Sequence, residues 1–371
     1  MRIGYSFWGF LGDYKEDAKG NVLSTPDGNA AYGGYLIDAM QRAGHDVLLM
    51  QEDRDWPAFQ RHGRGDFGSF STSRRFRAYL GSVPSHIGLP KLDVLFLEWR
   101  FPIPGRNTEA DRGSPGYQRD LERQSELLGY YSTTGARIIV WDMDYKLTPD
   151  DERRLASIGV RTILETSVSP KQVIIPRARV EPPCRAEDLL LWPTANCDVG
   201  RKLVYVGSRY ERDDVIDEWI RPVSDRFPGQ VHFYGNWERT LEDCQSRWPG
   251  VSFHGRISMK DFGDAYSTAV AVPLLAKKEY LEHGFITPRI WEAIIFGSIP
   301  VGLGSHKGIE QYLPSDLIAR TPSELGSVVS MLAACTTDER NKYRTMVAER
   351  IGFMDVSNFV RTIERETHGE G

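Results

Sequence analysis

The segment Phe285–Leu303, FITPRIWEAIIFGSIPVGL, combines a helix start, an arginine, a glutamate and a following buried strand. We expect Thr287 to be the N-cap and Pro288 the first helical residue. The free backbone N–H groups and the helix dipole at that end would stabilise a diphosphate, and Arg289 adds a cation. One turn further, the Glu292 carboxylate could accept both hydroxyls of a ribose. This order predicts a nucleotide site, although a buried helix-to-strand corner with a Thr-Pro cap explains it equally.

Acidic residues follow two predicted strands in the first half of the chain. Asp142 and Asp144 come after the run Arg137–Trp141, and Glu98 follows the run Leu92–Leu97. The carboxyl ends of parallel strands are where doubly wound sheets keep their chemistry. A carboxylate there can take a proton from an attacking hydroxyl or stabilise charge that develops during reaction. We therefore take all three acids as candidate catalytic residues.

Each of these acids also has a plainer interpretation. Asp144 could cap the turn after its strand, and Glu98 could pair with Arg100 or another basic group. If the strand continued, alternation would point Asp142 and Asp144 to the same side. An Asp-x-Asp pair also suits a divalent cation that carries a diphosphate.

Strand-like and helix-like segments alternate along the chain and predict two parallel α/β units. The first contains apolar runs separated by helical spacing at Ile3–Trp8, Ala30–Ala43, Asp46–Met50, Leu92–Glu98, Tyr117–Tyr131, Arg137–Trp141 and Arg161–Leu164. The second begins after a proline-rich lapse and contains Lys202–Val206, Val231–Tyr234, Val251–His254, Ala269–Leu274, Pro288–Phe296 and Pro300–Gly302. We expect a first domain over 1–185, a linker over 186–200, a second domain over 201–345 and a helix over 346–371 that returns to the first domain.

Composition limits the class of protein without naming a function. The 371 residues suffice for about two domains, and 40% hydrophobic and 26% charged residues are ordinary for a folded soluble protein. A net charge of −5 argues against wholesale coating of a polyanion. Four scattered cysteines, no long apolar run and no signal-peptide pattern predict a cytoplasmic protein without a membrane partner.

The second half resembles the donor-binding region of GT-B glycosyltransferases, in particular the CgeB-like, exostosin-like and fucosyltransferase-like groups. The residues that carry the resemblance are TPRIWEAIIFGSIPVGLG followed by YLP, within 269–314. The likeness is weaker over 202–268 and only architectural over 1–180. It implies a GT-B fold, two Rossmann-like domains facing across a cleft, and a nucleotide-sugar held by the second domain. It assigns Glu292 to the ribose, and Thr287, Pro288 and Arg289 to the phosphates.

The resemblance also assigns roles to two strand ends of the second domain. The loop of Ser208 and Arg209 would face the donor phosphates, and His254 and Arg256 would lie beside the nucleobase. A UDP-sugar is the expected co-substrate, with no other cofactor. No metal is expected, because GT-B enzymes use the helix end and basic side chains in place of a cation.

One departure from the family is visible. Retaining families with paired glutamates place the first glutamate seven residues before the second, and here that position is Gly284, with Glu282 the nearest upstream acid. This argues against a retaining mechanism and leaves the stereochemistry open.

A basic segment in the first half suggests an acceptor. Residues 61–77 interleave arginines and phenylalanines with one acid, in the order Arg61, Arg64, Asp66, Phe67, Phe70, Arg74, Arg75, Phe76 and Arg77. Such a pattern suits a nucleic-acid backbone and unstacked bases, although a solvated loop explains it too. Phage-type enzymes with similar donor motifs glycosylate hydroxymethylated pyrimidines in DNA, which requires base flipping. We take Arg74, Arg75 and Arg77 as candidate acceptor-binding residues and DNA as the best single acceptor. We expect the protein to be a monomer or a weak dimer. If it is phage-encoded, we expect it in the host cytoplasm.

Other classes remain open. The acceptor could instead be a small molecule or a surface polysaccharide. A non-catalytic nucleotide-sugar-binding protein would keep Arg289 and Glu292 and dispense only with the acid of the first domain. A nucleotide-sugar epimerase that uses NAD is disfavoured, because no full G-x-G-x-x-G fingerprint is present.

Overall fold

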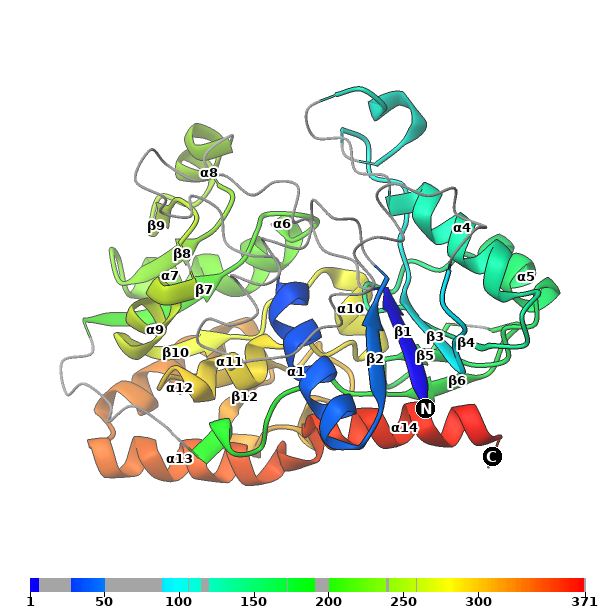
Figure 1. Cartoon of the computed structure of the whole chain (residues 1–371). Helices are drawn as coiled ribbons and strands as arrows, with labels where there is room; N and C mark the ends of the chain where they lie inside the picture. The colour runs from blue at the N-terminus through cyan, green and yellow to red at the C-terminus, as the bar shows by residue number, and fades with distance from the viewer. Residues whose placement is uncertain are drawn as a thin grey trace.

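The computed structural model describes residues 1–6, 28–50, 89–105, 107–114, 120–171, 173–190, 200–237, 240–257 and 259–369. They form two lobes, each built on a six-stranded sheet in which every strand pair is parallel (Figure 1). The predicted α/β class with two doubly wound sheets is confirmed.

The first sheet has the strand order β2-β1-β3-β4-β5-β6. Its strands are β1 (Arg2–Ser6), β2 (Asp46–Leu49), β3 (Val94–Glu98), β4 (Arg137–Trp141), β5 (Ile163–Glu165) and β6 (Arg177–Arg179). Its helices are α1 (Gly28–Arg42), α4 (Asp120–Tyr131) and α5 (Pro149–Ser157). The order reverses direction between β1 and β3, so the carboxyl ends of these central strands meet where such sheets bind ligands.

Both faces of this sheet are covered, as the continuous apolar strands predict. Alternate side chains of β3 serve different faces: Phe96 packs with Trp141 in one cluster, and Leu95 and Leu97 pack with Leu127 of α4 in another. The strands are therefore rigid supports for whatever follows their carboxyl ends.

The second sheet has the strand order β12-β11-β10-β7-β8-β9. Its strands are β7 (Arg201–Val206), β8 (Val231–Tyr234), β9 (Val251–His254), β10 (Ala269–Pro273), β11 (Ile299–Leu303) and β12 (Ile318–Ala319). Its helices are α6 (Asp213–Val215), a π-helical turn (Ile216–Ile220), α7 (Arg221–Arg226), α8 (Leu241–Arg247), α9 (Met259–Ser267), α10 (Lys278–His283), α11 (Arg289–Ile295), α12 (Pro322–Ala334) and α13 (Thr337–Arg350).

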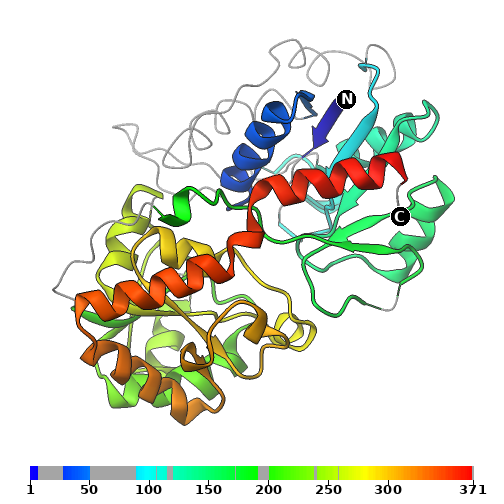
Figure 2. The same ribbon diagram turned by 90° about the horizontal axis from the view of Figure 1, so that it is seen from below.

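The chain returns to the first lobe near its end. The sequence predicts a helix over 346–371, but the structure breaks it at Ile351–Asp355, between α13 and α14 (Val356–His368). At the break the Val356 N–H donates to the Cys184 carbonyl at 2.7 Å, so the outgoing and returning segments pair. Figure 2 shows α14 running from the second lobe onto the first, beside α1.

Aromatic and ionic contacts hold α14 on the first lobe. The ring of Phe359 lies 4.9 Å from that of Trp141, and Glu364 contacts His45 at 2.9 Å. None of the helices in the described ranges is long and apolar enough to cross a membrane.

Candidate functional site

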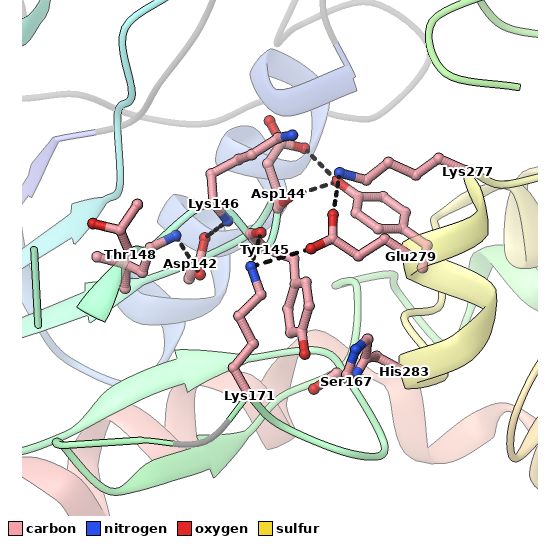
Figure 3. A network of polar contacts seen from close by, with 12 residues as sticks. Asp142, Asp144, Tyr145, Lys146, Thr148, Ser167, Lys171, Lys277, Glu279 and His283 are labelled. Atoms are coloured by element: carbon pink, nitrogen blue, oxygen red, sulfur yellow. Dashed lines mark hydrogen bonds and ion pairs between the residues drawn. The ribbon is translucent and has the colours of Figure 1, made fainter. Parts of the chain in front are cut away.

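The two lobes meet where the loop after β4 faces α10. Figure 3 shows Asp142, Asp144 and Lys146 on that loop, opposite Lys277 and Glu279 at the start of α10. The loop turns sharply because Tyr145 adopts φ 56°, a left-handed conformation that costs a bulky residue about 1–2 kcal/mol. Strained residues of this kind cluster at functional sites, where surrounding contacts hold them in place.

Asp142 holds this turn together. Its carboxylate accepts the backbone N–H of Lys146 at 2.8 Å and that of Leu147 at 3.0 Å. The side chain is 1% exposed, and burial raises its pKa in spite of these bonds. Because β4 ends at Trp141, the alternation that would align Asp142 with Asp144 does not apply. The placement argues against the catalytic role considered for Asp142, since its oxygens already bind the backbone.

Asp144 instead faces the second lobe. The Tyr280 hydroxyl of α10 donates to the Asp144 carbonyl oxygen at 2.8 Å and lies 3.3 Å from its Oδ1. The side chain is half-buried. Burial raises its pKa, and the charges of Lys277 and Lys146 and the Tyr280 bond oppose that rise. A half-buried carboxyl with a raised pKa is a stronger proton acceptor than an ordinary aspartate, as a general base requires.

Glu98 lies inside the first lobe. It is fully buried and accepts a hydrogen bond from the Tyr5 hydroxyl. The neighbouring Arg100 donates to Ser6 Oγ at 3.0 Å and to the Glu98 carbonyl at 3.4 Å. This enclosure argues against direct contact between Glu98 and an acceptor, and its catalytic role stays an untested prediction.

The Asp-x-Asp spacing does not assemble a cation site. Asp142 binds its own loop while Asp144 contacts α10. No group of three or more histidine, cysteine, aspartate or glutamate side chains suited to a metal occurs in the described ranges.

A pocket of about 690 Å³ lies between the loop after β7 and the start of α10. Its lining includes Arg209, Glu211, Lys277 and Lys278. Lys146 of the first lobe reaches Glu211 at 3.9 Å, so both lobes contribute charge to its edge.

Lys277 is the most enclosed cation of this pocket, with 3% of the residue exposed. Its ammonium contacts Glu279 at 3.0 Å and lies 4.2 Å from the centre of the Tyr280 ring. Burial lowers its pKa. Sequence reasoning missed Lys277, Tyr280 and Lys146; the available signal was their position just after the carboxyl ends of β10 and β4.

Helix α11 begins one residue later than predicted. Pro288 is its N-cap, no side chain caps it, and Thr287 Oγ1 lies 3.4 Å from Arg289 Nη1. Thr287 is therefore corrected from N-cap to a neighbour of the arginine. The helix spans seven residues, from Arg289 to Ile295.

Arg289 joins two strand ends. Its guanidinium donates to the carbonyls of Val206 at 3.1 Å and Leu275 at 2.9 Å, and lies 4.5 Å from the Tyr205 ring. Glu292 is half-buried on the same helix. Burial raises the pKa of the nearby Tyr266 hydroxyl, the charge of Glu292 adds to that rise, and the charge of Arg289 opposes it. The arginine thus has a structural role at the position assigned to phosphate.

Arg209 is engaged by carboxylates. It pairs with Asp213 at 2.6 Å and with Asp243, and it lies 5.3 Å from the Trp248 ring. The adjacent Ser208 is exposed. A phosphate at this loop would compete with two acids for Arg209, which the sequence did not reveal.

The predicted base-binding residues lie at the end of β9. The His254 ring stacks on Tyr234 at 4.4 Å and on His232 at 5.2 Å, and burial lowers the pKa of His254. Arg256 is exposed two residues later. This row of neutral rings lies at the carboxyl edge of the second sheet, as expected, and its contacts are to protein aromatics.

Gly284 explains the departure from the paired-glutamate pattern. It adopts φ 67°, and a Cβ there would lie 2.4 Å from the Lys307 carbonyl oxygen and 2.9 Å from Val168 Cβ. The Gly284 carbonyl accepts the Val168 N–H at 3.2 Å, and the His283 carbonyl accepts the Ser169 N–H at 3.0 Å, linking α10 to the first lobe. No glutamate fits at this position without moving that contact.

The candidate acceptor residues Arg74, Arg75 and Arg77 lie outside the described residues. The same holds for the rest of the basic segment 61–77 and for the loop after β1.

Comparison with known proteins identifies the fold. No family model matches this sequence, and no curated protein matches it. Among solved structures, the β-glucosyltransferase of T4 phage in complex with UDP-glucose matches with a TM-score of 0.60 and 13% identity over 99% of both chains. HepE of Anabaena, in complex with UDP and glucose, matches with a TM-score of 0.57 and 11% identity over 100% of both chains.

Sucrose-phosphate synthase of Thermosynechococcus elongatus matches with a TM-score of 0.59 and 12% identity over 100% of both chains. The predicted GT-B fold is confirmed over the length of the chain. A further matching structure is that of the DNA-modifying enzyme β-glucosyltransferase, and one matching structure of the T4 phage enzyme contains UDP and Mn²⁺.

Proposed function

We propose that this chain is a glycosyltransferase that moves a sugar from a UDP-sugar to an acceptor hydroxyl, with Asp144 as the general base. The observation that carries the proposal is a half-buried carboxyl of raised pKa set between two lobes of the GT-B fold, beside buried Lys277. The structural neighbours that bind UDP or UDP-glucose support this donor.

In the proposed reaction the Asp144 carboxylate removes the proton of the attacking hydroxyl. The acceptor oxygen forms a bond to the anomeric carbon as the bond from that carbon to the diphosphate breaks, and UDP leaves with the electron pair. Lys277 and Lys146 offset the negative charge that grows on the diphosphate. A single displacement of this kind inverts the anomeric centre, and the glycine at 284 in place of the paired glutamate supports that course.

For the donor we retain Glu292 at the ribose and Arg289 near the phosphates. In this arrangement Arg289 acts partly by holding the ends of β7 and β10, whose carbonyls it binds. We also keep four proposed donor contacts on the neighbouring strand ends: Ser208, Arg209, His254 and Arg256.

We expect Glu292→Ala to weaken binding of both UDP and uridine roughly 10- to 150-fold, because hydrogen bonds to a charged group contribute roughly 1.5–3 kcal/mol. Arg289→Ala should weaken UDP by a similar factor and leave uridine unchanged, because uridine has no phosphate. Isothermal titration calorimetry measures both. Arg350→Ala, which removes an arginine bond of 2.8 Å to the Leu313 carbonyl, is the matched control and should bind UDP normally. Unaltered UDP affinity in both donor variants would reject this donor site.

The proposed acceptor is a 5-hydroxymethylpyrimidine in DNA. Support comes from the likeness to a DNA-modifying enzyme along nearly the whole chain and from the interleaved arginines and aromatics of segment 61–77. A pyrimidine in a duplex must leave the stack to reach Asp144 between the lobes.

We expect radiolabelled glucose to pass from UDP-glucose to a duplex containing 5-hydroxymethylcytosine and not to the same duplex with cytosine, which lacks the attacking hydroxyl.

The reaction should persist in EDTA, because lysine charges are proposed to stabilise the leaving group. Complete loss of activity that Mn²⁺ restores would replace this with a metal-assisted mechanism. Transfer to a small sugar with no DNA binding at low salt would overturn the DNA acceptor and leave the donor site standing.

Salt dependence adds a test of the basic segment. Log K for duplex binding falls by about 0.9 per neutralised phosphate as log salt rises. Replacing Arg74, Arg75 and Arg77 together by glutamine should reduce that slope by up to about three phosphates, while UDP binding stays constant.

A further inference from the structure

Tyr280 is the point at which the second lobe touches the proposed base of the first. Its hydroxyl lies 2.8 Å from the Asp144 carbonyl oxygen and 3.3 Å from Oδ1, so one group contacts both the main chain and the carboxylate of Asp144. The bond to the carbonyl positions the loop, and the approach to Oδ1 orients the carboxylate.

The tyrosine is itself held firmly. The residue is 7% exposed, its ring stacks on Phe285 at 4.3 Å, and the Lys277 ammonium lies 4.2 Å from the ring centre. Burial raises the pKa of the hydroxyl well above its ordinary value, so it stays protonated and donates. The end of α10 is also bonded to the first lobe, through the N–H of Ser169 to the His283 carbonyl.

We infer that Tyr280 is a positioning residue that sets the orientation of Asp144 from the opposite lobe, so that the base is assembled only in this arrangement of the two lobes. The inference rests on the proposed role of Asp144. Tyr280 acts through Asp144 and needs no contact with either substrate.

The groups that face Asp144 fix the direction of the expected effect. They are Lys146 on its own loop, Lys277 and Tyr280 from α10, and Arg212 from the loop after β7. Each lowers the pKa of Asp144 against the effect of burial. Loss of the Tyr280 hydroxyl should therefore raise the pKa of Asp144 and leave its orientation less defined.

The test is Tyr280→Phe, which keeps the ring and removes the hydroxyl. Titration of ¹³C-labelled aspartate carboxyls by NMR, with Asp144→Asn to assign the signal, should show a higher pKa for Asp144 in Tyr280→Phe. With hydroxymethylated DNA as acceptor, kcat should fall about tenfold and the acid limb of the rate should move to higher pH. If DNA is not glycosylated, the same changes should appear in the hydrolysis of UDP-glucose, with water as acceptor. UDP affinity should not change.

Tyr312→Phe is the matched control. Tyr312 is also buried and also joins the lobes, because its hydroxyl donates to Glu181 at 2.9 Å, but it does not contact Asp144. An unchanged Asp144 titration, with a rate no lower than that of Tyr312→Phe, would overturn the inference. Full activity of Asp144→Asn would reject the proposed base, whereas the NMR titration would still decide whether Tyr280 controls this carboxyl.

Discussion

Replacing Asp144 by asparagine should lower the turnover of sugar transfer by about 10²- to 10⁴-fold while UDP affinity stays within a factor of two, because general base catalysis contributes on that scale and the proposed donor contacts lie elsewhere. Asparagine keeps the shape of the side chain and can still contact the Tyr280 hydroxyl, but it cannot accept a proton. Steady-state transfer kinetics and calorimetry of UDP binding give the two numbers.

The pH dependence of the same variant follows from the raised pKa of Asp144. The reaction needs the deprotonated form, so the wild-type rate should rise as pH rises through that pKa, and the residual rate of Asp144→Asn should lack this limb. Between the unfolded and folded pKa values the folded state binds more protons than the unfolded state, so ionised Asp144 lowers stability as pH rises through that interval. The variant should then be at least as stable as wild type at neutral pH.

Asp142→Asn separates this effect from general damage to the loop. The amide can accept only one of the two backbone N–H bonds that the carboxylate accepts, so stability should fall by about 1–3 kcal/mol while transfer by folded protein persists. If Asp142→Asn removes activity and Asp144→Asn does not, the assignment of the base is reversed.

Gly284→Ala should reduce the free energy of unfolding by about 2–5 kcal/mol. A left-handed φ of 67° costs an alanine about 1–2 kcal/mol, and overpacking against the Lys307 carbonyl, 2.4 Å from the new Cβ, adds roughly 1–3 kcal/mol. The link between α10 and the first lobe runs through this residue, so Tyr280 should also lose contact with Asp144. Urea denaturation followed by circular dichroism measures the change in stability.

Gly229→Ala supplies the control for backbone strain alone. Gly229 has a similar φ of 72°, and its Cβ would meet nothing within 4 Å. It should lose only about 1–2 kcal/mol. Equal losses at the two glycines would show that close packing at 284 is unimportant and would remove the steric account of why no glutamate stands there.

The sequence by itself determined the architecture of this protein and which residues follow the ends of its strands. Apolar runs such as Arg137–Trp141 have one stable solution, a strand covered on both faces, and β4 occupies that range in the structure. Because parallel strands share a carboxyl edge, the sequence also indicated that Asp142, Asp144, Ser208 and Arg209 would follow strand ends. Local composition carries this information, since apolar patterning and chain direction are local properties of each element.

Only the tertiary structure decided what each side chain does there. Arg209 and Arg289 are cations in any sequence, but their partners come from other elements of the second lobe: Asp243 of α8, 34 residues away, and the carbonyls of Val206 and Leu275. Asp142 and Asp144 are two residues apart, yet one binds its own loop and the other meets Tyr280 from 136 residues away. Burial, pKa and hydrogen bonding depend on groups brought together in space, so spacing along the chain could not rank these acids.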